Sequence, residues 1–170
     1  MNWIGLWTLT SREVGRFFKV YRQTVIPGLI SSVLYILIFG FTLEQRISSI
    51  EGISYTIFII PWLIMMNTLT NASSNPSSSL LQMKLTGQVP DLMQAPLSSL
   101  EISLAFIVGG VVRGVVNGIL ILLIGMWIGG MEVLYPIATI GFIFVVSVAF
   151  SSMLEKATET TKMNSMVAIG

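Results

Sequence analysis

Long apolar stretches alternate with short polar segments along the chain. Four of them cover approximately residues 25–43, 53–75, 102–128 and 133–154. At a rise of about 1.5 Å per residue, about 20 helical residues cross the hydrocarbon core of a bilayer, so each stretch is a candidate membrane span. The second stretch becomes polar toward its end and can complete a crossing only if those side chains face protein. The pattern predicts an all-α, polytopic membrane helix bundle with four transmembrane helices.

Residues 3–22 precede these spans and have an amphipathic pattern. At about 100° per residue, aromatic side chains fall on one helical face and basic side chains on the opposite face. This pattern is typical of a helix that lies in the headgroup layer, and a helix packed on a protein partner is the alternative. A capping box at residues 10–13 predicts a helix start near Ser11, and Pro27 suits the first turn of the next span. Trp3, Trp7 and Phe18 define the aromatic face. Arg12, Arg16 and Lys19 define the basic face.

The polar segment of residues 76–99 has the features of a structured loop with one or two short helices. Gly87 is expected to break the first helix. A second can open at Pro90 with Asp91 in its first turn, where the helix dipole favours an acid. Ser98 and Glu101 fit a capping box for the helix that follows.

The third span combines regularly spaced glycines with a charge. Gly110, Gly114 and Gly118 recur every four residues and predict a helix-packing seam, within the chain or between two copies. Arg113 lies in the same span, where a charge costs at least ~2.5–3 kcal/mol, so it either faces protein, with Asn117 as a partner, or snorkels to the headgroups.

The composition excludes a soluble domain. Hydrophobic residues make up 54% of the 170 residues, charged residues only 10%, and the mean hydropathy is +0.84. A typical soluble domain has about 25% charged residues. The chain has no cysteine and no histidine, its net charge of +1 gives no basic footprint for nucleic acid, and it contains no P-loop motif. Its glutamates are not paired within a span, so an enzyme is not expected.

The basic residues predict the orientation. If the N-terminus is cytosolic, only Arg46 of the nine basic residues lies outside and only Arg113 lies within a span. This asymmetry favours an N-in, C-in topology. The seven basic residues expected on the cytosolic side are Arg12, Arg16, Lys19, Arg22, Lys84, Lys156 and Lys162.

Short motifs in a specific order cover residues 7–118, and as a set they carry a family resemblance. They are Arg12-Glu13, Arg16, Gln23-Thr24-Val25, Pro27, Leu34-Tyr35, Ile38-Phe39-Gly40, Tyr55, Phe58-Ile59-Ile60-Pro61, Leu63-Ile64-Met65-Met66, Asn71-Ala72, Asp91-Leu92, Ala95-Pro96-Leu97, Gly109-Gly110 and Arg113-Gly114. In this order they resemble the permease subunits of ABC type-2 exporters, the group that includes daunorubicin-resistance and nodulation-factor exporters.

The resemblance implies a membrane-spanning permease subunit of an ATP-driven exporter in a bacterial or archaeal cell membrane. Two such subunits pair, here expected as a homodimer, and each docks a separate ATP-binding subunit. ATP and its hydrolysis belong to that partner, so this chain is expected to hold no cofactor and no catalytic residue. Residues 1–154 would be the membrane domain, with residues 3–22 as its connecting helix and residues 76–99 as its coupling loop. We expect the docking surface to consist of Leu81, Met83, Lys84, Asp91, Leu92 and Met93.

The resemblance implies six spans, two more than the four predicted here, and we expect these two to be missing from this chain. Residues 155–170 resemble the cytosolic tail before a fifth span. We therefore expect a fragment or the product of a truncated gene. The alternative function is a non-transporting membrane scaffold, or a decayed transporter fragment, which would not need to bind an ATPase in a nucleotide-sensitive way.

Overall fold

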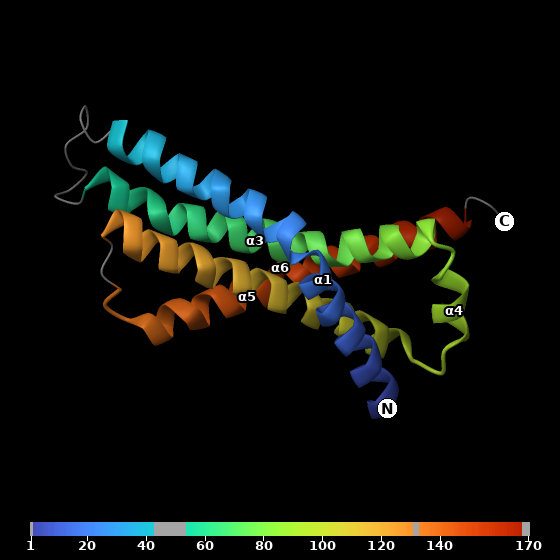
Figure 1. Cartoon of the computed structure of the whole chain (residues 1–170). Coiled ribbons are helices and arrows are strands. Elements are labelled where there is room, and N and C mark those ends of the chain that lie inside the picture. Colours follow the sequence, from blue (N-terminus) through green and yellow to red (C-terminus); the bar gives the residue numbers. More distant parts are fainter. Residues whose placement is uncertain (1, 43–53, 131–132, 168–170) are drawn as a thin grey trace.

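The computed structural model describes residues 2–42, 54–130 and 133–167, and its regular elements within these ranges are helical (Figure 1). They are α1 (Trp3–Tyr35), the π-helix η1 (Ile36–Phe41), α3 (Tyr55–Leu85), α4 (Val89–Gln94), α5 (Ser99–Gly129) and α6 (Pro136–Val167). Three stretches of the described chain are long and apolar enough to cross a membrane: Trp3–Gly40, Ser99–Ile128 and Pro136–Met153. The predicted all-α membrane class is confirmed for these three. α3 does not reach this apolar composition, so a fourth crossing stays a prediction.

The long helices are arranged around α3 and α5, which pack along each other. α6 contacts both of them, and α1 packs mainly on α5. The N-terminus, α4 and the C-terminal end of α6 lie toward one end of the molecule in Figure 1. The end of η1 and the start of α3 lie at the opposite end, together with the junction of α5 and α6. We call the first of these the α4 end.

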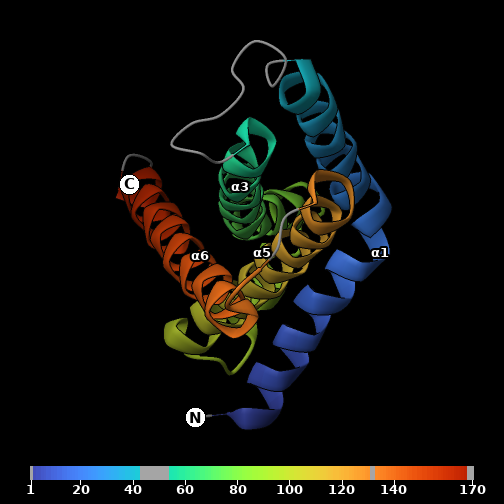
Figure 2. The ribbon, with the colours of Figure 1, turned by 90° about the vertical axis from the view of Figure 1, so that its left-hand side faces the viewer.

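α1 is one continuous helix that includes both the predicted amphipathic helix and the start of the first span. It begins at Trp3, because the Asn2 side chain caps it by accepting the Gly5 N–H at 3.1 Å. The predicted start near Ser11 is therefore wrong, and Pro27 lies inside a helix rather than in a first turn. A proline inside a helix removes one backbone hydrogen bond and favours a bend. Figure 2 shows that α1 changes direction along its length.

α3 has its polar side facing protein. Thr68, Asn71, Asn75 and Ser79 recur at helical spacing and are buried, whereas large apolar side chains of the same helix are exposed. The helix continues past Pro76 to Leu85, about ten residues beyond the predicted end of the span. The chain then turns at Gly87, whose φ of 68° is in the left-handed region. The predicted break at Gly87 is thus confirmed, but the connecting loop is shorter than expected.

Local end signals placed α4 and the start of α5 correctly. Asp91 lies in the first turn of α4. At the start of α5, Ser98 Oγ accepts the Glu101 N–H at 3.3 Å and Glu101 Oε2 accepts the Ser98 N–H at 2.8 Å. The predicted capping box is confirmed. Glu101 also accepts the N–H of Asn2, which joins the start of α1 to the start of α5.

The apolar core occupies the half of the bundle away from the α4 end. It contains Ile36 of η1, residues 60, 63 and 64 of α3, residues 121 and 122 of α5, and Ile143 of α6. The other half of the bundle contains the buried polar residues of α3. The structure therefore separates an apolar half from a polar half that adjoins the α4 end.

Candidate functional site

The glycines of α5 form a close-packing seam inside this chain. A Cβ at Gly110 would lie 2.8 Å from the carbonyl oxygen of Ala72, and one at Gly114 would lie 2.9 Å from the Ala72 Cβ. At Gly118 it would lie 2.5 Å from Thr68 Oγ1. The glycines also meet α6, because the same virtual atoms lie close to Ser151, Ser147 and Ile143. Of the two interpretations open from sequence, the structure places the seam between α3, α5 and α6 of one subunit.

Arg113 faces protein and does not extend to the surface. Its side chain is buried, and Nε donates to Asn71 Oδ1 of α3 at 3.2 Å. The predicted partner Asn117 does not accept from the guanidinium. Instead, its amide donates to the backbone carbonyl of Arg113 at 2.8 Å. Among the described residues, the side-chain acceptor of Arg113 is therefore an amide oxygen of α3. The spacing of residues within α5 could not reveal it.

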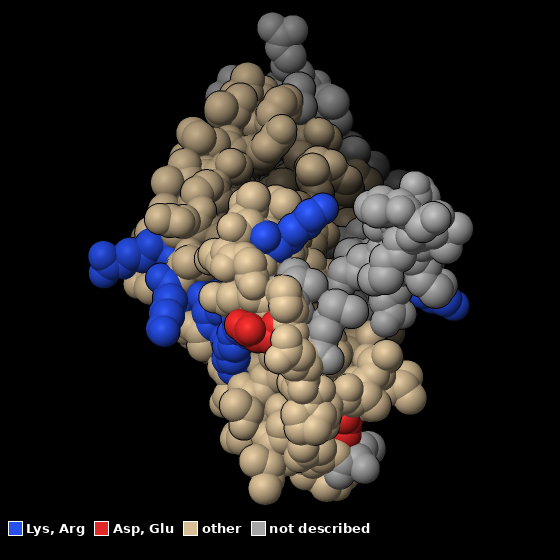
Figure 3. Space-filling view, turned by 90° about the vertical axis from the view of Figure 1, so that its right-hand side faces the viewer, with Lys and Arg blue, Asp and Glu red and all other residues tan. Residues whose placement is uncertain are grey.

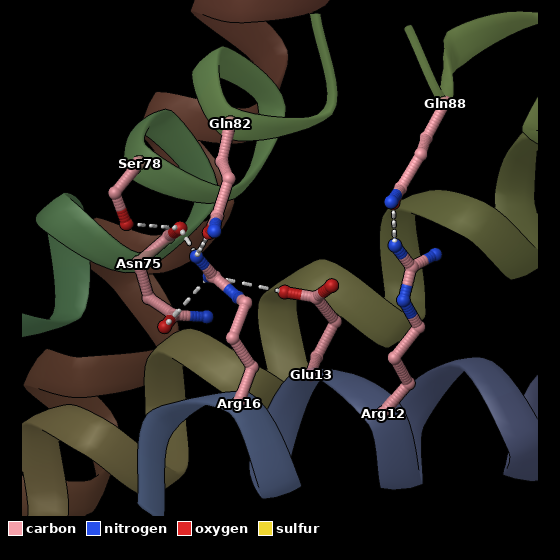
Figure 4. A network of polar contacts seen from close by, with 7 residues as sticks. All are labelled: Arg12, Glu13, Arg16, Asn75, Ser78, Gln82 and Gln88. Atoms are coloured by element: carbon pink, nitrogen blue, oxygen red, sulfur yellow. Dashed lines mark hydrogen bonds and ion pairs between the residues drawn. The ribbon is translucent and has the colours of Figure 1, made fainter. Parts of the chain in front are cut away.

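A polar network joins α1 to α3 beside this seam (Figure 4). Arg16 donates to Glu13 Oε2 at 3.2 Å, to Gln82 Oε1 at 3.3 Å and to the side-chain and backbone oxygens of Asn75 at 3.4 Å. Glu13 is almost fully buried, at 1% exposure. Arg12 donates to Gln88, the residue that precedes α4. This network connects the amphipathic half of α1 to the C-terminal part of α3 and to the residue before α4.

The network changes the interpretation of the predicted amphipathic helix. Its aromatic residues Trp3, Trp7 and Phe18 are exposed, as expected for side chains that face lipid. Lys19 is also exposed. Arg12 and Arg16, however, hydrogen-bond to α3 and Gln88, so the basic face packs in part on protein. Periodicity identified the two faces but could not identify what each one contacts.

The predicted docking residues lie at the end of α3 and on α4, with different exposures. Leu81, Lys84 and Asp91 are exposed, and Leu92 is partly buried. Met83 is only 3% exposed, so its predicted place on a docking surface is wrong. The reason is helical geometry, because residue 83 is about 200° around the helix from residue 81. The side chain of Met93 lies outside the described residues.

Two exposed leucines were not predicted at this end. Leu85 is 78% exposed and lies one turn after Leu81, and Leu100 is 76% exposed in the first turn of α5. The i, i+4 spacing of residues 81 and 85 was the sequence signal that could have identified the first of them.

A groove of about 630 Å³ separates the N-terminal half of α1 from α4. Arg12 and Asp91 contribute opposite charges to its walls, and the remaining lining is mostly apolar or neutral. Its lining residues are Asn2, Gly5, Thr8, Leu9, Arg12, Gln88, Asp91, Leu92, Ala95, Pro96 and Leu97.

The fold and this site define a class: a polytopic helical membrane domain with a structured polar connection at one end. The profile of the ABC-2 type transporter family matches residues 5–167, so the chain belongs to this family. It is similar to the inner membrane transport permease YadH of Escherichia coli K12, with 36% identity over 127 residues. The YadH protein of Shigella flexneri matches equally well. No solved structure matches the chain.

The alignment covers 75% of this chain and 50% of YadH, so the chain spans about half the length of the curated relatives it matches. Membership of the family has two direct consequences. The chain is a multi-pass membrane protein similar to an inner membrane permease, and it belongs to a family whose membrane subunits do not themselves hydrolyse ATP. ABC-2 permeases generally pair with ATP-binding subunits.

Proposed function

We propose that this chain is the membrane-spanning permease part of an ATP-driven exporter, that it forms part of the substrate pathway, and that it docks a separate ATP-binding subunit. The observation that carries the proposal is the α4 end. There α3 extends beyond the predicted span and presents exposed leucines beside charged side chains. Exposed apolar groups rimmed by charges are typical of a protein–protein contact. We call Leu81, Lys84, Leu85 and Asp91 the docking surface.

The α4 end is the cytosolic end in this proposal. Figure 3 shows basic side chains gathered on this face, and the positive-inside rule assigns such a face to the cytosol. The N- and C-terminal ends of the described chain lie toward the same side, which supports an N-in, C-in topology with four crossings. α3 is then the fourth crossing, and its buried polar residues avoid lipid because they face α5 and α1.

Coupling requires that a movement at the docking surface reach the membrane interior. α3 is a single helix from Leu85 to the buried residues Asn71 and Thr68, so a displacement of its end can be transmitted along its axis. The seam that it meets brings α3 and α5 into close contact through the glycines of α5, so a displacement of α3 acts directly on α5. Arg16 and Arg12 tie α1 to the same end of α3.

The proposal also includes the binding site for ATP and the number of permease subunits. ATP binds to the partner subunit, and the permease pairs with a second permease subunit, most simply a copy of itself. An exporter must move between two conformational states. ATP binding to the partner shifts the equilibrium between them only if the partner makes different contacts with this chain in each state.

The test is site-specific cross-linking, for which the absence of native cysteine is convenient. A single cysteine at Leu85, in native membranes, would carry a photoreactive group. We expect a product with a P-loop ATPase, with a yield that changes when a non-hydrolysable ATP analogue is added. The matched control is a cysteine at Ile137, which is 87% exposed at the other end. A product that contains no ATPase, or whose yield does not respond to nucleotide, would contradict the proposal and favour a scaffold.

A further inference from the structure

A small pocket lies between α1 and α3, next to the groove but separate from it. Its volume is about 150 Å³, below the roughly 300–1,000 Å³ of sites for drug-sized ligands. Arg12 and Gln88 line both the pocket and the groove, so their hydrogen bond is part of the wall between them. Its full lining is Arg12, Glu13, Arg16, Ser79, Gln82, Met83, Thr86 and Gln88.

Two hydrogen-bond donors of this lining have no partner within the described chain. Ser79 is 1% exposed and its Oγ is not hydrogen-bonded, and Arg16 Nε is buried and also unpaired. Buried polar groups are nearly always hydrogen-bonded, so two orphans beside one pocket indicate a group that would satisfy them. Arg16 Nε can only donate and the Ser79 hydroxyl can also donate, so a group that presents acceptors would satisfy both.

The charge of the lining favours an anion. Arg12 and Arg16 contribute two positive charges and Glu13 one negative charge, which leaves a net charge of +1. The carboxylate of Glu13 is already paired with Arg16 Nη2 at 3.2 Å, so Arg12 and Arg16 Nε remain for a ligand. Guanidinium groups and hydroxyls that approach from different helices suit a tetrahedral oxyanion, which accepts hydrogen bonds in several directions.

We propose that this pocket, between α1 and the end of α3, binds a phosphate group. Two sources share this chemistry: the phosphate of an anionic phospholipid and free inorganic phosphate. The exposed Trp3 and Trp7 on the same half of α1 favour the lipid, because tryptophan is enriched at the level of the headgroups. A bound phosphate would bridge α1 to α3 through Arg12, Arg16 and Ser79, and would make their contact depend on the lipid. This inference does not rest on the docking surface or on any transported substrate.

The first arm of the test measures lipid retention by native mass spectrometry of the full chain, with phosphatidylglycerol and phosphatidylcholine as probes. We expect selective retention of phosphatidylglycerol, reduced roughly tenfold by Ser79→Ala or Arg12→Gln, which corresponds to one charge-assisted hydrogen bond. Lys19→Gln removes the same charge from the same helix outside the pocket, and it should retain lipid like the wild type. Ser79→Ala removes one hydroxyl, so it gives a result even if Arg12→Gln does not fold.

The second arm measures the midpoint of thermal unfolding of lipid-depleted protein with and without inorganic phosphate, at constant ionic strength. If inorganic phosphate stabilises the protein, Ser79→Ala abolishes this stabilisation and no lipid is selectively retained, the ligand is free phosphate. Selective lipid retention, with or without that stabilisation, would identify the lipid, and both results support a phosphate site. The proposal is overturned if neither probe depends on Ser79 and Arg12, or if Lys19→Gln has the same effect as Arg12→Gln.

Discussion

At Gly114, the space that a side chain would fill is taken by α3 and α6. A Cβ there would lie 2.7 Å from Ser147 Oγ and 2.9 Å from the Ala72 Cβ. The serine hydroxyl can rotate away, but the Ala72 Cβ moves only with its backbone, so α3 and α5 would have to separate. We expect Gly114→Ala to lower the free energy of unfolding by about 1–3 kcal/mol, measured by denaturation in detergent micelles.

Gly141 of α6 is the matched control for this substitution. It is exposed, and a Cβ there would meet nothing within 4 Å. Gly141→Ala should be neutral, or more stable by about 0.5–1 kcal/mol, because alanine has the higher helix propensity. Equal effects of the two substitutions would mean that α5 is not closely packed at Gly114.

The pair of Asn71 and Arg113 makes a second residue-scale prediction. Asn71→Leu removes the acceptor of a buried guanidinium and should lower the free energy of unfolding by about 1–3 kcal/mol or more. Arg113→Met in the same background removes the unpaired charge, so the double variant should lose less than the sum of the two single variants. A double-mutant cycle from the same denaturation measurement gives this coupling. Strictly additive effects would show that the two side chains do not interact.

These residues show which contacts can be predicted from the sequence of one helix and which cannot. The four-residue spacing of the glycines indicated a seam, because that signal is contained in one helix. Asn71 is 42 residues from Arg113, so only the packing of α3 on α5 brings them together. Asn117, the partner expected from sequence, is one turn away, and its amide bonds to the backbone carbonyl of Arg113.

At the scale of elements, local sequence signals predicted where the chain turns after α3 and where α5 begins. They did not predict that α1 and α3 continue past the expected boundaries. The capping box at Ser98 and the turn at Gly87 depend on residues within a few positions of each other. α1 instead continues through Pro27, which removes one backbone hydrogen bond, and no local signal in the sequence indicated this continuity. The sequence did not indicate that α3 continues to Leu85, because the residues around Pro76 are polar and polar residues resemble a loop when their protein contacts are unknown.

The end of α3 makes a prediction for coupling. Lys84 is exposed in the last turn of α3, and Asp91 is exposed in the first turn of α4. Each charge interacts favourably with the dipole of its own helix. In the complex with the ATP-binding partner, Lys84→Glu or Asp91→Lys should reduce substrate-stimulated ATPase activity by roughly tenfold or more if the charge contacts the partner. Lys19→Glu is the control, because Lys19 is exposed on α1 away from the docking surface. Unchanged stimulation in both docking variants would place the ATPase contact elsewhere.

At the scale of the whole molecule, we propose that the chain crosses the membrane four times, with the α4 end in the cytosol. Three stretches of the described chain are long and apolar enough to cross. The fourth depends on α3, whose buried polar face makes its composition resemble that of a soluble helix. Sequence patterns indicate this topology through the basic residues, but the side of the membrane is set by the cell and not by the helix packing.

Single-cysteine accessibility tests this claim directly, because the chain has no cysteine of its own. Thr42, Gln94 and Leu134 are exposed, and they lie outside α3 and outside the apolar stretches Trp3–Gly40, Ser99–Ile128 and Pro136–Met153. Each would be replaced by cysteine in turn. We expect a membrane-impermeant maleimide to label positions 42 and 134 in intact cells with an opened outer membrane, and to label position 94 only after the inner membrane is permeabilised. Labelling of positions 42 and 94 from the same side would show that α3 does not cross the membrane and would contradict the account.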